Sequence, residues 1–288
     1  MSIKSKRSKL NIDDSSVESF GDEWSRFDQS EVSSQELSTI FNRYFSIFPW
    51  RKLSSLSEGF DMGCGSGRWA KFVAPRVRKL HCVEPSLAIK VAEQSLTGYG
   101  NVVFHRASVD STDLMPNSQD FGYSIGVLHH VPDTCRALRS CVDLLKPGAP
   151  LLIYLYYAFD NRPYWFRTLW RCSEVARAVI SRLPPRFKGI ITDIIAVLIY
   201  LPIARVSGVL ERLGLDVHSV PLSFYRQHSL YTMRTDARDR FGTPLEQRFT
   251  KMQIQEMMIS CGLEDIVFAD SDPYWCAVGF KVSSRCVE

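Results

Sequence analysis

The chain has 288 residues, about twice the ~150 residues that serve as a prior for one domain, so its length allows two domains or one enlarged domain. Apolar residues make up 45% and charged residues 23%, as in ordinary globular proteins, which excludes a disordered, collagen-like or low-complexity chain. The net charge of +4 is too small to indicate a nucleic-acid partner, which usually requires a clustered basic face.

The termini and cysteines predict a cytoplasmic protein. Residues 1–16 are polar and basic where a signal peptide needs an apolar segment, so we expect a disordered tail. The eight cysteines form no Cys-x-x-Cys pair, which favours reduced thiols and predicts no metal site. The longest apolar run, Ile194–Ala204, has 11 residues and contains Pro202, short of the ~20 that a spanning helix needs. We therefore predict no transmembrane segment.

Residues 17–57 carry aromatic and aliphatic side chains at helical spacing and predict an N-terminal helical cap. Residues 58–157 then alternate short β-branched runs with helical patterns, which is typical of a parallel sheet built from βαβ units. The predicted strands are Phe60–Met62, Leu80–Glu84, Val102–Ala107, Phe121–Val127 and Leu151–Tyr157.

The alternation is interrupted after the fifth strand. Residues 158–250 are rich in aromatic residues and arginine and have helical periodicity. We interpret this segment as an insertion that covers a substrate. Residues 251–288 return to one helix, Ile254–Ile259, and two strands, Ile266–Ala269 and Trp275–Lys281, which close the same sheet. The pattern thus favours one enlarged α/β domain, and it does not fix the oligomeric state.

A glycine-rich turn follows the first predicted strand, with the sequence Asp61-Met62-Gly63-Cys64-Gly65-Ser66-Gly67-Arg68. Glycines allow close approach of a ligand, and the helix that begins here offers free N–H groups. A dinucleotide fingerprint requires Gly-x-Gly-x-x-Gly, but Arg68 occupies the third glycine position. Glu84 ends the next strand, 21 residues after Gly63, where a carboxylate can accept hydrogen bonds from ribose hydroxyls. These residues predict a nucleoside site.

The set of motifs resembles the class I S-adenosylmethionine-dependent methyltransferases, in the branch that acts on small molecules and lipids. The resemblance covers residues 60–157 well and residues 250–281 loosely. The motifs that carry it are the glycine turn, Val83-Glu84-Pro85-Ser86, the segment from Ser124 to Asp133, and Leu145-Lys146-Pro147-Gly148. It implies a Rossmann-like fold, a seven-stranded and mostly parallel sheet with helices on both faces, and S-adenosyl-L-methionine as the cofactor.

The resemblance also implies roles for single residues. The glycine turn would hold the methionine part of the cofactor and Glu84 the ribose, while Ser108, or Asp110 in its place, would contact the adenine. The backbone that ends the fourth strand would pass under the reactive sulfonium. The implied cofactor residues are Asp61, Gly63, Cys64, Gly65, Gly67, Glu84, Pro85, Ser108, Val109, Gly126 and Val127.

His129 and His130 follow the fourth strand and are the candidate catalytic residues. An imidazole with a pKa near ~6.5 can take a proton from a nucleophilic oxygen or nitrogen, although such a pair can equally stabilise a loop. Neighbouring strand residues project to opposite faces, which disfavours a shared metal ion.

Aromatic side chains follow the fifth strand, where open α/β sheets bind ligands. Tyr156, Tyr157 and Arg162 are therefore candidate substrate contacts, and Trp24 of the N-terminal cap is a fourth. A second polar and aromatic cluster, from Tyr231 to Phe241 and including Asp239, is a candidate pocket wall without an assigned role.

The insertion carries the basic excess of the chain, with 14 Lys and Arg against 8 Asp and Glu. Its segment 165–206 could lie against a membrane surface, or it could be a covering helix with a solvated Arg face. The leading hypothesis is methyl transfer to O or N of a small molecule. Two alternatives remain: a membrane-associated lipid or isoprenoid methyltransferase, and an inactive cofactor-binding partner subunit.

Overall fold

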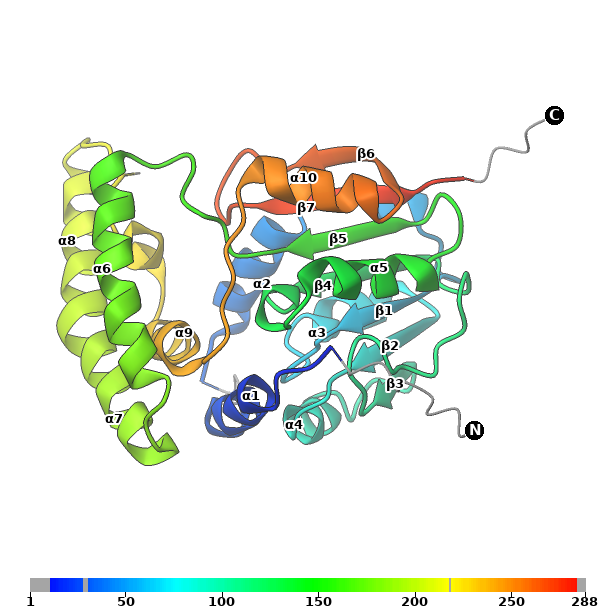
Figure 1. The fold of residues 1–288 in the computed structure, drawn as a ribbon, viewed down its shortest axis with the longest axis horizontal. Coiled ribbons are helices and arrows are strands. Elements are labelled where there is room, and N and C mark those ends of the chain that lie inside the picture. Colours follow the sequence, from blue (N-terminus) through cyan, green and yellow to red (C-terminus); the bar gives the residue numbers. More distant parts are fainter. Residues whose placement is uncertain (1–10, 28–30, 218, 284–288) are drawn as a thin grey trace, which may run out of the picture.

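A computed structural model describes residues 11–27, 31–217 and 219–283. Seven strands form one sheet in the order β3-β2-β1-β4-β5-β7-β6, and only β7 runs antiparallel to its neighbours (Figure 1). The strands are β1 (Glu58–Met62), β2 (Lys79–Val83), β3 (Val102–His105), β4 (Phe121–Ile125), β5 (Pro150–Tyr154), β6 (Leu263–Phe268) and β7 (Cys276–Lys281). The predicted fold class, a Rossmann-like and mostly parallel seven-stranded sheet, is confirmed.

Helices cover both faces of this sheet, because its central strands are apolar on both sides. One apolar core joins the sheet to α5 and α10, and a second joins the opposite face to α2, α3 and α4. The core helices are α1 (Asp14–Arg26), α2 (Ser34–Tyr44), α3 (Ala70–Val73), α4 (Ala88–Ser95), α5 (Thr134–Leu144) and α10 (Lys251–Ser260). Short helical turns are η1 (Trp50–Lys52), η2 (Ala74–Arg76) and η3 (Leu128–His130).

The predicted tail, residues 1–16, is too long at its C-terminal end. Helix α1 begins at Asp14, because the Asp13 side chain caps it by accepting from the Ser16 N–H. Asn11 is buried against the core. Residues 1–10, where most of the predicted tail falls, lie outside the described residues.

The insertion forms a helical layer beside the carboxyl ends of the strands (Figure 1). Helix α9 lies between this layer and the core, and it packs against α1, α6 and α7. The elements of the insertion are α6 (Tyr164–Ile180), α7 (Pro185–Ile195), η4 (Ala196–Tyr200), α8 (Leu201–Arg212), η5 (Ser223–Gln227) and α9 (Leu230–Gly242).

The prediction of no transmembrane segment rested on the 11-residue apolar run, and the structure continues that run in both directions as part of a longer helix. Helices α7, η4 and α8 run on as one helix, Pro185–Arg212, of 28 residues. Its most apolar 18-residue window has a mean hydropathy of 1.9, so by length and composition the helix could cross a membrane. Pro202 does not end it, because Pro202 occupies the second position of α8, directly after the π-helical η4. A proline inside a helix removes one backbone hydrogen bond and crowds the preceding turn, and the irregular π-helical turn before Pro202 accommodates this. Only 28% of the apolar window is buried.

Candidate functional site

A cavity of about 700 Å³ lies where the carboxyl ends of the strands face the insertion. On the core side the glycine turn lines it. The N–H groups of Gly63 and Cys64 both donate to the Val83 carbonyl, at 2.8 and 3.1 Å, which ties the turn to β2. Gly63 has φ +79°, and a Cβ atom there would lie 2.4 Å from Val127 Cγ1. The turn therefore needs glycine both for its conformation and for the packing of β4 below it.

Glu84 is buried at the end of β2 and lines the same cavity. Its two oxygens accept from the N–H groups of Ser86 and Gly65, at 2.9 and 3.1 Å, which fixes the orientation of the carboxylate. Burial raises the pKa of Glu84, while these hydrogen bonds act against the rise. Each oxygen keeps acceptor capacity for a hydroxyl donor.

Asp61 lies beneath the glycine turn instead of in the cavity wall. It is buried, and its Oδ2 has no hydrogen-bond partner. Burial, with the nearby Glu84 carboxylate as a further contributor, raises the pKa of Asp61 to about 8. A buried carboxyl oxygen without a partner is costly, so a cation or donor bound at the turn would relieve it.

Nine of the eleven predicted cofactor residues line the cavity; Asp61 and Gly67 lie behind its wall. Ser108 lines the cavity, but Asp110, the alternative adenine contact, does not. Asp110 instead accepts from Arg136 Nη2 at 2.7 Å and from the Asn11 N–H at 3.0 Å, so it is committed to the core.

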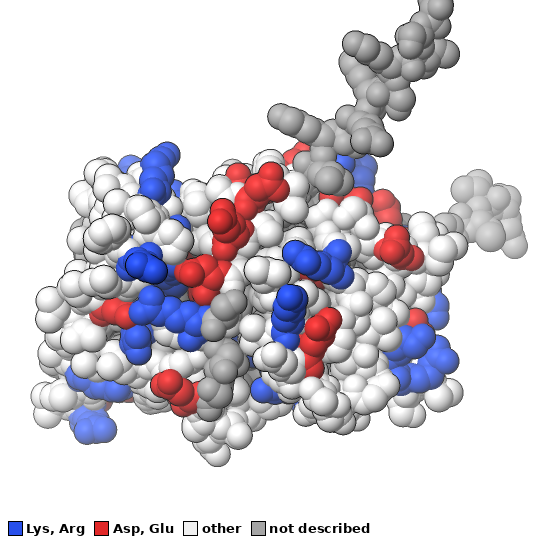
Figure 2. All heavy atoms as spheres, turned by 90° about the horizontal axis from the view of Figure 1, so that it is seen from below, with Lys and Arg blue, Asp and Glu red and all other residues white. Residues whose placement is uncertain are grey.

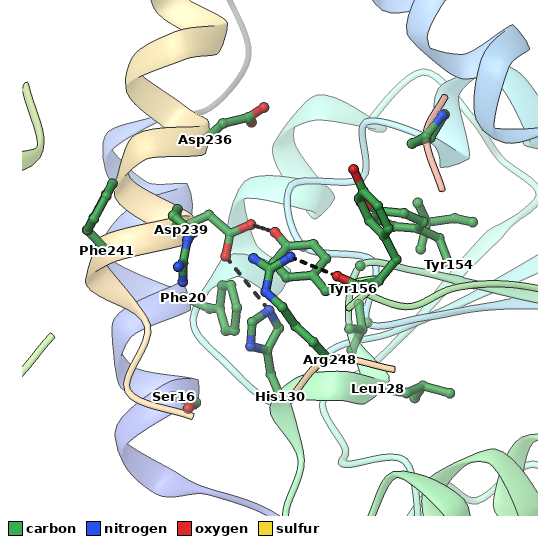
Figure 3. Close-up of a pocket in the computed structure, with 18 of the residues that line it drawn as sticks. Ser16, Phe20, Leu128, His130, Tyr154, Tyr156, Asp236, Asp239, Phe241 and Arg248 are labelled. Atoms are coloured by element: carbon green, nitrogen blue, oxygen red, sulfur yellow. Dashed lines mark hydrogen bonds and ion pairs between the residues drawn. The ribbon is translucent and has the colours of Figure 1, made fainter. Parts of the chain in front are cut away.

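The structure places His130 in the wall of the cavity, beside Phe20 and below Asp239 in the view of Figure 3. Its Nδ1 lies 2.7 Å from the Leu245 carbonyl oxygen and must donate to it, so the neutral ring carries its lone pair on Nε2. That Nε2 has no hydrogen-bond partner and lies 3.7 Å from Asp239 Oδ1. The other oxygen of Asp239 accepts from the Tyr156 hydroxyl. His130 therefore presents a proton acceptor backed by a carboxylate.

His129 has a different environment. It is fully buried, does not line the cavity, and stacks on Tyr156 with ring centroids 3.9 Å apart. Burial, then the neighbouring His130, lowers the pKa of His129 well below its usual value. Both histidines lie in η3 and not on a strand, so the two-face argument against a shared metal does not apply to them. Among the described residues, no group of three or more His, Cys, Asp or Glu is arranged to hold a metal ion.

All four predicted substrate residues line the cavity, but at different places. Tyr156 faces Asp239 beside His130, whereas Arg162 donates to the Tyr157 hydroxyl at 3.3 Å, on another stretch of the wall. Trp24 packs on the glycine turn, where a Cβ atom on Gly65 would lie 3.1 Å from its indole ring. Trp24 therefore belongs to the cofactor half of the cavity.

Two acidic residues of α9 line the cavity without having been assigned a role from the sequence. Asp236 and Asp239 are three residues apart and so share a helix face (Figure 3). Asp236 accepts from the Tyr225 hydroxyl at 2.8 Å, and burial raises its pKa to about 6. The cluster from Tyr231 to Phe241 was the available signal, but only the fold shows that both carboxylates line the cavity and that Asp239 faces His130.

Comparisons with known proteins agree with this site. Residues 60–153 match a family model described as "Methyltransferase domain". Over these residues the chain is similar to methyltransferase domains. The chain is 30% identical over 105 residues to a ubiquinone biosynthesis O-methyltransferase of Nitrosospira multiformis, across 35% of this chain and 42% of that protein. It is 27% identical over 183 residues to one from Xanthomonas euvesicatoria, across 61% and 71%.

The chain thus spans less than half the length of the first of these relatives. Among solved structures, the CurJ carbon methyltransferase superposes with a TM-score of 0.50 at 12% identity, across 90% of this chain and 58% of the other, which supports the fold.

The cofactor of this family is S-adenosylmethionine, and the residues present fit it. Glu84 offers oriented oxygens to the ribose, and the partnerless Oδ2 of Asp61 suits the amino group at the glycine turn. Burial of Asp61 makes this attraction stronger than it would be in water.

Proposed function

We propose that the protein transfers a methyl group from S-adenosylmethionine to a nucleophilic oxygen or nitrogen of a small organic molecule. The observation that carries the proposal is the position of His130, whose buried Nε2 makes no hydrogen bond, in the wall of the same cavity as the glycine turn and Glu84. The names of the relatives favour oxygen as the accepting atom.

The chain's own residues have three tasks in this reaction: they align the acceptor, exclude water and remove a proton. The bound cofactor supplies an electrophilic methyl group on a sulfonium. The walls align the acceptor and exclude water, which is most of what methyl transfer requires. His130 Nε2 takes the hydroxyl proton of the acceptor. At the same time the hydroxyl oxygen bonds to the methyl carbon, and the carbon–sulfur bond breaks. Asp239 then faces an imidazolium, a favourable ion pair in a buried site. The products are the methylated acceptor and S-adenosylhomocysteine.

Calorimetric titration tests the cofactor half of the proposal. Wild-type protein should bind S-adenosylmethionine and S-adenosylhomocysteine but not NAD. Glu84→Ala should weaken this binding at least about tenfold, roughly 1.4 kcal/mol for the lost ribose hydrogen bonds. Glu93→Ala, an exposed glutamate on α4, is the matched control. Binding of NAD alone would refute the proposal, and an unchanged affinity of Glu84→Ala would remove Glu84 from the site.

Incubation with labelled cofactor and cell extract tests the transfer half. A labelled small molecule should form with the wild type. Binding of cofactor without any labelled product would favour the inactive partner subunit instead. The cytoplasmic location drawn from the cysteine pattern stays a prediction.

The outer face of the insertion favours a second candidate, a methyltransferase that works at a lipid surface. Large apolar side chains repeat every four residues along the long helix and are exposed: Ile190, Ile194 and Leu198. Exposed arginines lie on the same layer, and Figure 2 shows basic side chains among wide uncharged areas at this end of the molecule. An apolar face with basic neighbours suits an anionic membrane surface.

A further inference from the structure

We infer that the methyl acceptor carries an extended apolar chain, and that the insertion holds this chain in a subsite of its own. The inference rests on the proposed function, because it concerns the half of the cavity that the cofactor does not need. The cofactor residues all belong to the core side of the wall, from the glycine turn to the end of β4. The part of the cavity that the insertion lines remains for the acceptor.

The chemistry of the wall changes abruptly beyond His130. Near His130, α9 contributes the carboxylate of Asp239, and Asp236 of the same helix also lines the cavity. By contrast, the described lining residues from α6, the long helix and segment 220–224 include no charged side chain. Those that form the apolar surface include Leu169, Ile195, Ile199, Ile203, Leu222 and Phe224. An acceptor with a polar head at His130 and an apolar chain pointing away from it would match both parts of the wall.

The apolar part of the cavity also reaches the protein surface. Leu169 on α6 and Ile199 on η4 line the cavity and are nevertheless 54% and 47% exposed. Cys172, one turn after Leu169, is exposed as well and lines the cavity. These three side chains thus belong both to the cavity wall and to the protein surface, and we call this part of the wall, on α6 and η4, the gap. A chain longer than the cavity would extend outward past these side chains, onto the apolar outer face of the insertion.

Two alkylphenols test the subsite, with the protein saturated by S-adenosylhomocysteine. 4-Ethylphenol and 4-nonylphenol share a hydroxyaryl head and differ only in chain length. We expect wild-type protein to bind 4-nonylphenol at least tenfold more tightly by calorimetry. Ile203→Trp, which fills the subsite, should remove most of this preference and leave 4-ethylphenol affinity unchanged. Val209→Trp on the same helix is exposed, does not line the cavity, and is the control.

A second variant guards against misfolding of Ile203→Trp. Ile199→Lys places a charge at the partly exposed gap and should also reduce the preference for 4-nonylphenol. Equal affinities of the two alkylphenols for wild-type protein would overturn the inference, as would a preference that both variants retain. S-adenosylhomocysteine binding is measured in the same samples, so failure of the proposed function shows there and not in the alkylphenol ratio.

The source of the chain is resolved by how the probe is delivered. 4-Nonylphenol is supplied either dissolved as monomer or dissolved in phosphatidylcholine vesicles. A transfer rate that rises with vesicle concentration identifies uptake from a bilayer, and a rate set by the free probe identifies uptake from water. With either source, Ile203→Trp should lower the transfer rate of 4-nonylphenol. An unchanged rate in this variant with both sources would contradict the subsite.

Discussion

Asp61 couples the cofactor site to pH. Burial raises the pKa of its carboxyl to about 8 in the folded chain, against an ordinary value of 3.8. Between these values the folded chain holds a proton that the unfolded chain has lost, so the free energy of unfolding falls as pH rises from about 4 to 8. Asp61→Asn should remove this fall in the free energy of unfolding, so the variant should be more stable than the wild type at pH 8. Thermal unfolding across that range measures it.

The same variant tests the contact with the cofactor. A bound ammonium group favours ionised Asp61, so wild-type protein should release protons on binding S-adenosylhomocysteine at pH 7. Calorimetry in buffers of different ionisation enthalpy counts them. Asp61→Asn should release fewer, whereas Asp270→Asn, an exposed aspartate, should match wild type. Equal proton release from all three proteins would contradict the role of Asp61.

His130 is the second residue whose local geometry makes a sharp prediction. Its Nδ1 is committed to the Leu245 carbonyl, so only Nε2 can accept a proton from the acceptor. His130→Gln should lower kcat by roughly 10²-fold or more, the usual contribution of a general base, and change S-adenosylhomocysteine affinity by less than about twofold. His105→Gln, a histidine outside the cavity, is the control. If His130→Gln kept full kcat, the protein would need no base at this position.

At the scale of elements, α1 acts as a cover that is fastened at its start. The Asn11 side chain donates to the Asp133 carbonyl at 2.7 Å and accepts from the Asp133 N–H at 2.8 Å. Phe20 and Trp24, further along α1, line the cavity. Asn11→Ala should cost about 1–3 kcal/mol for two hydrogen bonds, speed hydrogen exchange in α1 and weaken S-adenosylhomocysteine binding. Glu18→Ala, exposed on the same helix, should change none of these; protected α1 amides in Asn11→Ala would show that the fastening lies elsewhere.

The core elements were predictable because each has a local cause. Buried parallel strands form short apolar runs, so the seven strands lie within a few residues of the predicted ranges. Predicted strands that ran to Glu84, Ala107 and Val127 end earlier, because their last residues turn toward the ligand site. The polar Asn11 gave no comparable signal, since its partners, Asp110 and Asp133, are about a hundred or more residues away.

The insertion was less predictable because its shape depends on tertiary contacts. The Pro202 that seemed to end an apolar run is accommodated by a π-helical turn. Asp239 meets His130 only because α9 packs between the helical layer and the core. The spacing of residues in the sequence predicts neither the π-helical turn nor the contact between Asp239 and His130. The glycine turn and Glu84, by contrast, are both fixed by strand ends that the sequence marks clearly.

For the whole molecule, the uneven surface predicts membrane association through the insertion. Wild-type protein should sediment with vesicles of phosphatidylcholine and phosphatidylglycerol at low salt and less at high salt, because its exposed arginines attract anionic headgroups. Leu198→Glu, at a side chain 69% exposed on the long helix, should reduce binding roughly tenfold or more, since it replaces a residue whose burial contributes about 1.5–3 kcal/mol.

Leu56→Glu is the matched control, because Leu56 is 72% exposed but precedes β1, at the end of the strands away from the cavity. Vesicle binding should fall in Leu198→Glu and not in Leu56→Glu. Both variants should bind the cofactor as the wild type does. Equal losses in the two variants would indicate a general effect of charge. No sedimentation of wild-type protein at low salt would leave the apolar face without a lipid partner, and the acceptor would then have to arrive through water.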